Sequence, residues 1–98
     1  MKPAVFHPLV EQELVDAAAY YEEQKTGLGL EYLGEVEHAV NFLIRYPGAG
    51  SIVRNSIRRL FLPKFPYSLL YRVLESNQIR ILAVAHHKRR PQYWTGRE

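Results

Sequence analysis

The chain has 98 residues, of which 47% are hydrophobic and 23% charged, and this suffices for one domain with one core. It has no cysteine, which excludes disulfides, thiolate metal sites and a cysteine nucleophile. Its net charge of +3 is unevenly divided, because residues 1–50 hold three basic and eight acidic side chains (net −5), whereas residues 51–98 hold ten and two (net +8). The basic half predicts an anionic partner, either nucleic acid or an acidic protein segment, and the lack of an apolar run of signal-peptide or membrane-span length predicts a soluble cytoplasmic protein.

The acidic half predicts a strand followed by a helical hairpin. Val5 and Phe6 form a short apolar run that suits an edge strand, and Pro8 suits the first turn of a helix. Apolar side chains then recur at helical spacing over residues 9–25 and again over residues 28–46. Because the connector between the two helices is so short, we expect them to lie antiparallel, with their apolar stripes on a common surface.

After the glycine-rich turn that follows the second helix, the apolar pattern changes from helical to alternating. We predict strands over residues 52–53, 57–62, 67–74 and 78–86. The turns between the strands are short and therefore require antiparallel neighbours. Residues 1–98 are predicted to form one α+β domain, with a short N-terminal strand, an antiparallel helical hairpin, an antiparallel β-meander and a basic C-terminal tail.

The strand over residues 67–74 has one apolar-aromatic face and one mixed face that carries Ser68 and Arg72, and this mixed face is the candidate site. The same alternation places Arg58 and Arg59 on opposite faces of the preceding strand. Arginine has a rigid fork of donors that suits phosphate or carboxylate, so several arginines from adjacent strands can converge on one anionic group. The alternative interpretation is that these arginines only keep an exposed sheet soluble.

In the last predicted strand, alternation places Arg80 and His86 on the same face as Leu82 and Val84. His86 is then a candidate general acid or base, or else a histidine hydrogen-bonded at a strand end. Its neighbour His87 points to the opposite face, so the two are poorly placed to bind one metal ion. No other ligand set, phosphate loop, serine elbow or carboxylate pair has a familiar spacing, and we expect no metal and no cofactor.

The tail interleaves basic with aromatic residues, namely Lys88, Arg89, Arg90, Tyr93, Trp94 and Arg97. Such interleaving can hold a phosphate backbone while the aromatic rings stack on its bases. Alternatively, Tyr93 and Trp94 pack the tail onto the sheet, which the large apolar area of tryptophan favours.

Two long runs, RRLFLPKFPYSLLYRV and IRILAVAHHKRRPQYW, closely resemble the C-terminal half of RelE/ParE-type toxins, and the opening VFHPLVEQELVDAAAYYEEQ resembles their first strand and helix. The most specific pieces are Phe65-Pro66-Tyr67 with Tyr71-Arg72-Val73, and Ala83-Val84-Ala85-His86 followed by Arg89, Pro91, Tyr93 and Trp94. The resemblance covers essentially the whole chain and rests on the order and spacing of these pieces. It implies a toxin paired with a cognate antitoxin, whose flexible or acidic segment wraps the toxin and masks its basic surface.

Two mechanisms occur among the toxins that the chain resembles. RelE-like members are ribosome-dependent, metal-independent mRNA endonucleases, whereas ParE-like members bind DNA gyrase and poison its DNA cleavage cycle. Where the nucleases resemble Tyr-Arg-Leu-Val-Tyr, this chain reads Tyr67-Ser68-Leu69-Leu70-Tyr71, so Ser68 replaces an arginine expected to clamp the scissile phosphate. Arg89 and Tyr93 still resemble the tail arginine and tyrosine of the nucleases. We therefore expect a ParE-like, gyrase-directed toxin that is not an enzyme, with ribosome-dependent mRNA cleavage as the alternative and a degenerate, non-toxic relative as a third possibility.

Each of the two active alternatives predicts its own set of residues. The candidates for RNA cleavage are Arg58 or Arg59, Lys64, Arg72, His86, Arg89 and Tyr93. The candidates for contact with the target or the antitoxin are Arg58, Arg59, Lys64, Arg72, Arg80, His86, Lys88, Arg89, Arg90, Tyr93, Trp94 and Arg97.

Overall fold

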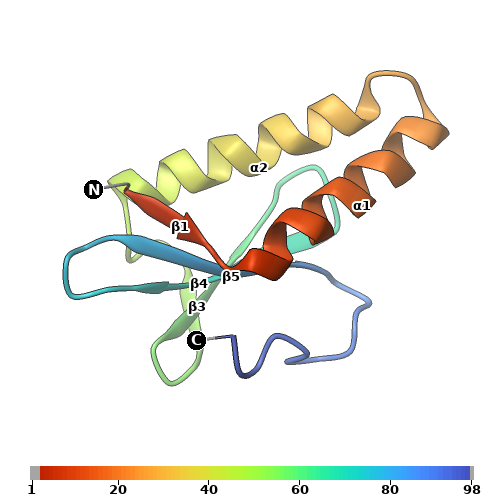
Figure 1. Ribbon diagram of the computed structural model, residues 1–98. Coiled ribbons are helices and arrows are strands. Elements are labelled where there is room, and N and C mark those ends of the chain that lie inside the picture. Colours follow the sequence, from red (N-terminus) through yellow and green to blue (C-terminus); the bar gives the residue numbers. More distant parts are fainter. Residues whose placement is uncertain (1–2, 98) are drawn as a thin grey trace.

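The computed structural model describes residues 3–97 (Figure 1). Its elements are β1 (Ala4–Phe6), α1 (Pro8–Gln24), α2 (Leu28–Arg45), β2 (Ser51–Arg54), β3 (Ile57–Phe61), β4 (Tyr67–Val73) and β5 (Ile79–His86). This is the predicted order, and each boundary lies within one residue of the predicted one. The α+β fold class is therefore confirmed.

The five strands form one sheet in the order β1-β5-β4-β3-β2. β2 to β5 form the predicted antiparallel meander. β1 lies at the edge and pairs in parallel with β5, from Ala4 opposite Ile79 to Phe6 opposite Ile81. Because this pairing ends at Ile81, β1 covers only the first half of β5.

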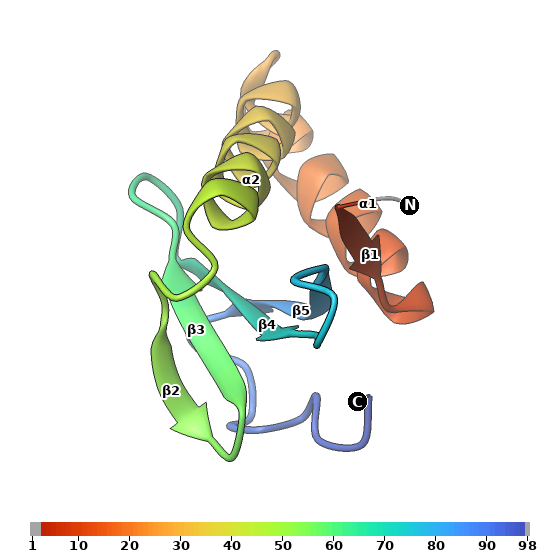
Figure 2. The same ribbon diagram turned by 90° about the vertical axis from the view of Figure 1, so that its left-hand side faces the viewer.

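The molecule has three layers, which are separated in Figure 2. The helical hairpin lies on one face of the sheet, and the tail, residues 87–97, lies on the other. On the tail side, Trp94 is only 5% exposed and packs with Ile57, Leu70 and Leu82 in a small apolar cluster. The interpretation that Trp94 packs the tail onto the sheet is therefore confirmed.

The tight turn of the hairpin depends on one carboxylate and two glycines. Glu22 of α1 accepts hydrogen bonds from the backbone N–H of Gly27 (2.9 Å) and of Gly29 (3.1 Å). These N–H groups lie at the start of α2, where backbone donors have no partner within the helix, so Glu22 supplies the missing acceptor. Gly27 has a φ of 91°, a conformation that favours glycine. At Gly29, a Cβ atom would lie 2.6 Å from the carbonyl oxygen of Ala18, so the absence of a side chain allows the two helices to approach.

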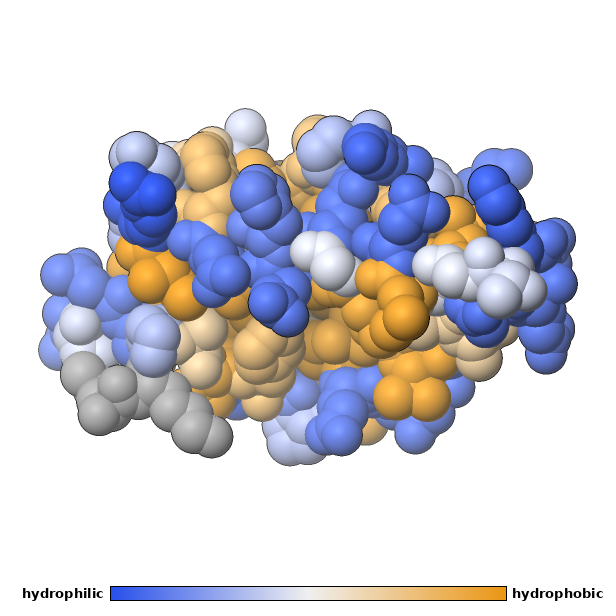
Figure 3. Space-filling model, turned by 90° about the horizontal axis from the view of Figure 1, so that it is seen from above, coloured by the Kyte–Doolittle hydropathy of each residue, from blue (hydrophilic) through white to orange (hydrophobic). Residues whose placement is uncertain are grey.

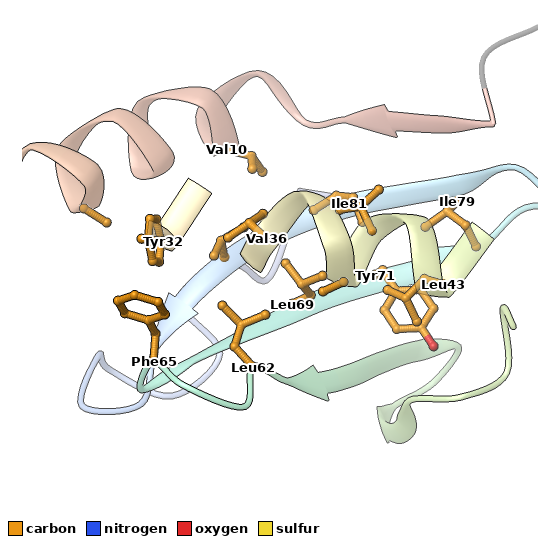
Figure 4. Close-up of a cluster of buried hydrophobic side chains, with 14 residues drawn as sticks. Val10, Tyr32, Val36, Leu43, Leu62, Phe65, Leu69, Tyr71, Ile79 and Ile81 are labelled. Carbon is orange, nitrogen blue, oxygen red and sulfur yellow. The ribbon is translucent and has the colours of Figure 1, made fainter. Parts of the chain in front are cut away.

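The main core lies between the hairpin and the sheet, as Figure 4 shows. Its largest fully buried side chains include Tyr32 and Leu43 of α2, Leu69 and Tyr71 of β4, and Ile79 and Ile81 of β5. The hydroxyl of Tyr71 accepts a hydrogen bond from the Gly50 N–H (2.9 Å) and donates one to the Pro47 carbonyl (2.8 Å). The core thereby fixes the loop that joins α2 to β2.

The outer face of the hairpin is not uniformly polar. Figure 3 looks onto this face and shows hydrophobic residues exposed among hydrophilic ones. A shallow groove there is lined mainly by apolar residues of β1, α1 and α2, among them Phe6, Leu14 and Leu33. Within residues 3–97, neither helix has the length and apolar character needed to cross a membrane.

Candidate functional site

An open pocket of about 480 Å³ lies on the tail side of the sheet, between β3, β4, the end of β5 and the tail. We call it the basic pocket. Its floor is formed by the buried residues Ser68, Leu70 and Ala85. Its exposed rim carries three arginines, Arg59, Arg89 and Arg90. A concave surface with apolar walls and a few polar groups of one charge is a typical binding site.

Two of the rim arginines are held by aromatic rings. The guanidinium carbon of Arg59 lies 4.7 Å from the ring centroid of Phe61, and that of Arg89 lies 3.9 Å from the ring centroid of Tyr93. A cation over an aromatic face at this distance contributes about 0.5–1 kcal/mol at an exposed site. Stacking restrains the guanidinium group and leaves its in-plane N–H donors available, so the rim suits a carboxylate or a phosphate.

The floor of the basic pocket carries a polar pair but no cation. Ser68 is only 3% exposed, and its Oγ lies 3.1 Å from Nε2 of His87. Ser68 lies on the mixed face of β4, as predicted, and the structure shows that the tail covers this face, where Leu70 packs with Trp94. His87, which the sequence did not single out as a site residue, is the histidine that meets it.

The predicted placement of His86 is wrong, because β5 contains a bulge. Leu70 pairs with Ala83 but Tyr71 pairs with Ile81, so Leu82 is an extra residue in β5. Leu82 therefore packs on the tail side and Val84 on the helix side, whereas strict alternation had placed them together. His86 follows Val84 to the helix side, where its ring lies 5.0 Å from that of Tyr67.

Several predicted residues lie outside the basic pocket. Lys64 lines a separate groove with Glu35 of α2, which accepts a hydrogen bond from the Lys64 backbone N–H (2.7 Å). Arg72 and Arg80 lie directly opposite each other on β4 and β5, and the Nε atom of each is buried without a hydrogen-bond partner in the described chain. Lys88 is exposed and does not line the pocket.

Two further predicted arginines make intramolecular contacts. Arg58 donates from Nη1 to the carbonyls of Gly48 (3.3 Å) and Gly50 (2.7 Å), on the loop between α2 and β2. Arg97 donates from Nη1 to Glu13 (3.0 Å) and to the carbonyl of Leu82 (3.1 Å). The predicted residues that line the basic pocket are Arg59, Arg89, Arg90, Tyr93 and Trp94. His86 borders the pocket at the end of β5, although its ring packs against Tyr67 on the helix side.

The fold is consistent with the result of a comparison with known families. The model of the family described as the ParE toxin of type II toxin–antitoxin systems matches residues 4–91, which include all the strands and helices found within residues 3–97. The chain belongs to the ParE toxin family. It is thus a toxin component, and this family implies a cognate antitoxin as partner. A search of curated proteins found no match.

Besides His87, sequence reasoning missed three residues that hold the tail beside the basic pocket, namely Glu13, Arg54 and Gln92. Glu13 of α1 accepts a hydrogen bond from the Tyr93 hydroxyl (2.8 Å), and Arg54 of β2 donates one to Gln92 of the tail (2.7 Å). A signal existed for Glu13, because it follows the buried Val10 by three residues and so lies near the inward face of an amphipathic helix. Nothing in the local sequence marks Arg54 or Gln92.

Proposed function

We propose that this toxin arrests growth by binding a protein, DNA gyrase, and that the basic pocket is its contact surface. Membership of the ParE family supports this, because the ParE-like toxins that the chain resembles are directed at gyrase. The observation that carries the proposal is Ser68, a neutral residue that is 3% exposed where the resembling nucleases have a phosphate-clamping arginine. A pocket with a neutral floor and a basic rim suits carboxylates presented by a partner protein.

The floor of the basic pocket lacks the positive charge that RNA cleavage would need beside the scissile phosphate. The transition state of phosphodiester cleavage carries extra negative charge, which a preorganised cation stabilises. Ser68 offers only a hydroxyl, and that hydroxyl is already paired with His87. Losing a charged clamp commonly costs a few kcal/mol, roughly a hundredfold in rate.

The arrangement of the other RNA-cleavage candidates also favours binding over catalysis. Lys64 lines another groove, and Arg72 lies beside Arg80 in the β4–β5 ladder. Tyr93 lines the pocket, but its pKa is raised by burial and also by its hydrogen bond to Glu13. Its phenol therefore stays protonated at neutral pH and is a poor proton acceptor.

The antitoxin is expected to use the same chemistry. We propose that an acidic segment of the antitoxin covers the arginine rim and so competes with the target. The net charge of +8 on residues 51–98 supports this, because such a surface speeds association with an acidic segment and orients it.

The test is supercoiling of relaxed plasmid DNA by purified gyrase in the presence of the purified toxin. We expect micromolar toxin to suppress supercoiling and to leave cleaved DNA when the reaction is stopped with detergent and protease. The Arg89→Gln variant is expected to lose most of this effect, because it removes a rim charge.

Primer extension on translated mRNA, after induction of the toxin in cells, tests the RNA-cleaving alternative. Intact messages together with inhibited gyrase support the proposal. Full supercoiling at micromolar toxin would overturn the proposal, and new 5′ ends in translated messages would then support the RNA-cleaving alternative, whereas intact messages would indicate a non-toxic relative.

A further inference from the structure

The tail reaches the basic pocket as a chain of turns, without a helix or a strand. Residues 87–97 include two positions with positive φ, Gln92 (59°) and Gly96 (97°), so the path reverses more than once. Backbone hydrogen bonds within such a segment are local and few, and its conformation depends on side chains that attach it elsewhere. Trp94 supplies an apolar attachment to the sheet.

The polar attachment of the tail is made by Glu13 of α1. One carboxylate oxygen of Glu13, Oε2, accepts hydrogen bonds from the Tyr93 hydroxyl (2.8 Å) and from Nη1 of Arg97 (3.0 Å). The other oxygen, Oε1, accepts one from the backbone N–H of Val84 (3.2 Å) on β5. Because β1 stops pairing with β5 at Ile81, this stretch of the strand edge is open to a side chain. Glu13 thus joins α1, the edge of β5 and the tail.

The contacts of Glu13 are shielded from water. The side chains of Arg97 and Glu13 are 12% and 13% exposed, and theirs is the salt bridge found within residues 3–97. Charge-assisted hydrogen bonds are stronger when they are partly buried, and removing one partner leaves the other without compensation. Loss of the Glu13 carboxylate would leave the Arg97 guanidinium and the Tyr93 hydroxyl without that acceptor.

Tyr93 transmits this attachment to the rim of the basic pocket. Its hydroxyl is bound to Glu13, while its ring lies 3.9 Å from the guanidinium carbon of Arg89. The guanidinium carbon of Arg97 lies 5.1 Å from the same ring. A single side chain therefore connects the carboxylate of α1 with a rim arginine.

We propose that Glu13 is a positioning residue, which fixes the tail against the sheet and thereby sets Arg89 at the rim of the basic pocket. Glu13 does not line the pocket and acts through Tyr93. The claim that the placement of Arg89 matters for toxicity rests on the proposed function of the pocket. The claim that Glu13 holds the tail rests only on the contacts described above and is independent of that function.

The first experiment measures the position of the tail through Trp94, the chain's single tryptophan. In the full chain with Glu13→Ala, we expect the emission of Trp94 to shift to longer wavelength, and acrylamide to quench it about twofold more strongly, because its cover is loosened. Glu13→Gln should give an intermediate result, since an amide oxygen still accepts from Tyr93 but carries no charge for Arg97. Glu11→Gln, an exposed change on the same helix, is the matched control and should leave the emission unchanged.

Tyr93→Phe addresses the case in which Glu13→Ala fails to fold. It keeps the ring that packs against Arg89 and removes only the hydroxyl that Glu13 binds. We expect the same direction of change in Trp94 emission, with the far-ultraviolet circular dichroism preserved. Unaltered emission and quenching in folded Tyr93→Phe and Glu13→Gln would overturn the proposal.

A double-mutant cycle on growth arrest tests the connection to Arg89. If Glu13 acts through Arg89, Glu13→Gln should raise the toxin level needed for arrest severalfold in the parent, and by much less in an Arg89→Gln background. Equal losses in both backgrounds would mean that Glu13 affects only stability, and would overturn the positioning role. Since growth arrest does not presuppose gyrase as the target, failure of the gyrase proposal would be seen separately, in the supercoiling assay.

Discussion

Ser68 and His87 meet on the floor of the basic pocket, with 3.1 Å between Oγ and Nε2. The pair gives the floor hydrogen-bonding groups without the fixed charge that an arginine would have supplied there. The positive charge of the pocket therefore lies on its rim, where Arg59 and Arg89 are stacked on aromatic rings. Partner binding should then depend on the rim and be insensitive to small changes of the floor.

Arg89→Gln should weaken growth arrest about tenfold or more, measured as the toxin expression level that halves the growth rate, because arginine is one of the residue types enriched among those whose loss costs about 2 kcal/mol or more of binding. Arg45→Gln is the matched control. Arg45 is also an exposed arginine near a tyrosine ring, 5.8 Å from Tyr46, but it ends α2 on the opposite side of the sheet. Similar losses in both variants would contradict a specific role for the rim and point to net charge alone.

The helices and the longer strands were predicted well because their apolar residues recur with a clear period, whereas β1 and β2 were predicted from short apolar runs. It failed at β5, where Ile81, Leu82, Ala83 and Val84 are all apolar and alternation cannot reveal which residue is extra. The bulge exchanges the two faces for everything beyond it, and so His87, rather than His86, reaches Ser68. The link from Glu13 to Tyr93 could not be predicted either, because it joins residues eighty positions apart.

Tyr71→Phe should destabilise the fold by about 1–3 kcal/mol in urea unfolding, because the buried Gly50 N–H and the Pro47 carbonyl both lose their partner. The aromatic ring is retained, so packing of the core is preserved. Tyr20→Phe, on a side chain that is 57% exposed, should change stability by less than about 0.5 kcal/mol. Equal effects of the two changes would show that the hydroxyl of Tyr71 does not hold the loop.

His7 should make the fold sensitive to mild acid. Its Nδ1 accepts a hydrogen bond from the Leu9 N–H (3.1 Å) at the start of α1, and its pKa is lowered from 6.5 by burial and by the charges of Arg97 and Arg80, against a smaller opposing effect of Glu13. The folded state binds a proton at His7 less readily than the unfolded state does. The free energy of unfolding therefore falls as the pH drops below 6.5, and the full loss is reached once the pH lies below the lowered pKa of the folded state.

The pH dependence of His7 can be isolated by substitution. His7→Asn keeps a side-chain acceptor at the start of the helix but cannot take up a proton. Its free energy of unfolding should therefore fall less than that of the parent between about pH 7.5 and about pH 5. His38→Asn, on an exposed residue of α2, is the control. An unchanged slope in His7→Asn would mean that other groups cause the acid sensitivity.

Two glycines of α2 should respond to alanine in opposite directions. At Gly29 the added Cβ would lie 2.6 Å from the Ala18 carbonyl oxygen, a backbone atom of α1 that can move only if the helices separate. Gly29→Ala should therefore cost about 1–3 kcal/mol in spite of the better helix propensity of alanine. At Gly34 the Cβ would meet nothing within 4 Å, so Gly34→Ala should stabilise the fold by about 0.5–1 kcal/mol. Urea unfolding of the two variants measures both effects, and a stabilised Gly29→Ala would mean that close approach of the helices does not require glycine.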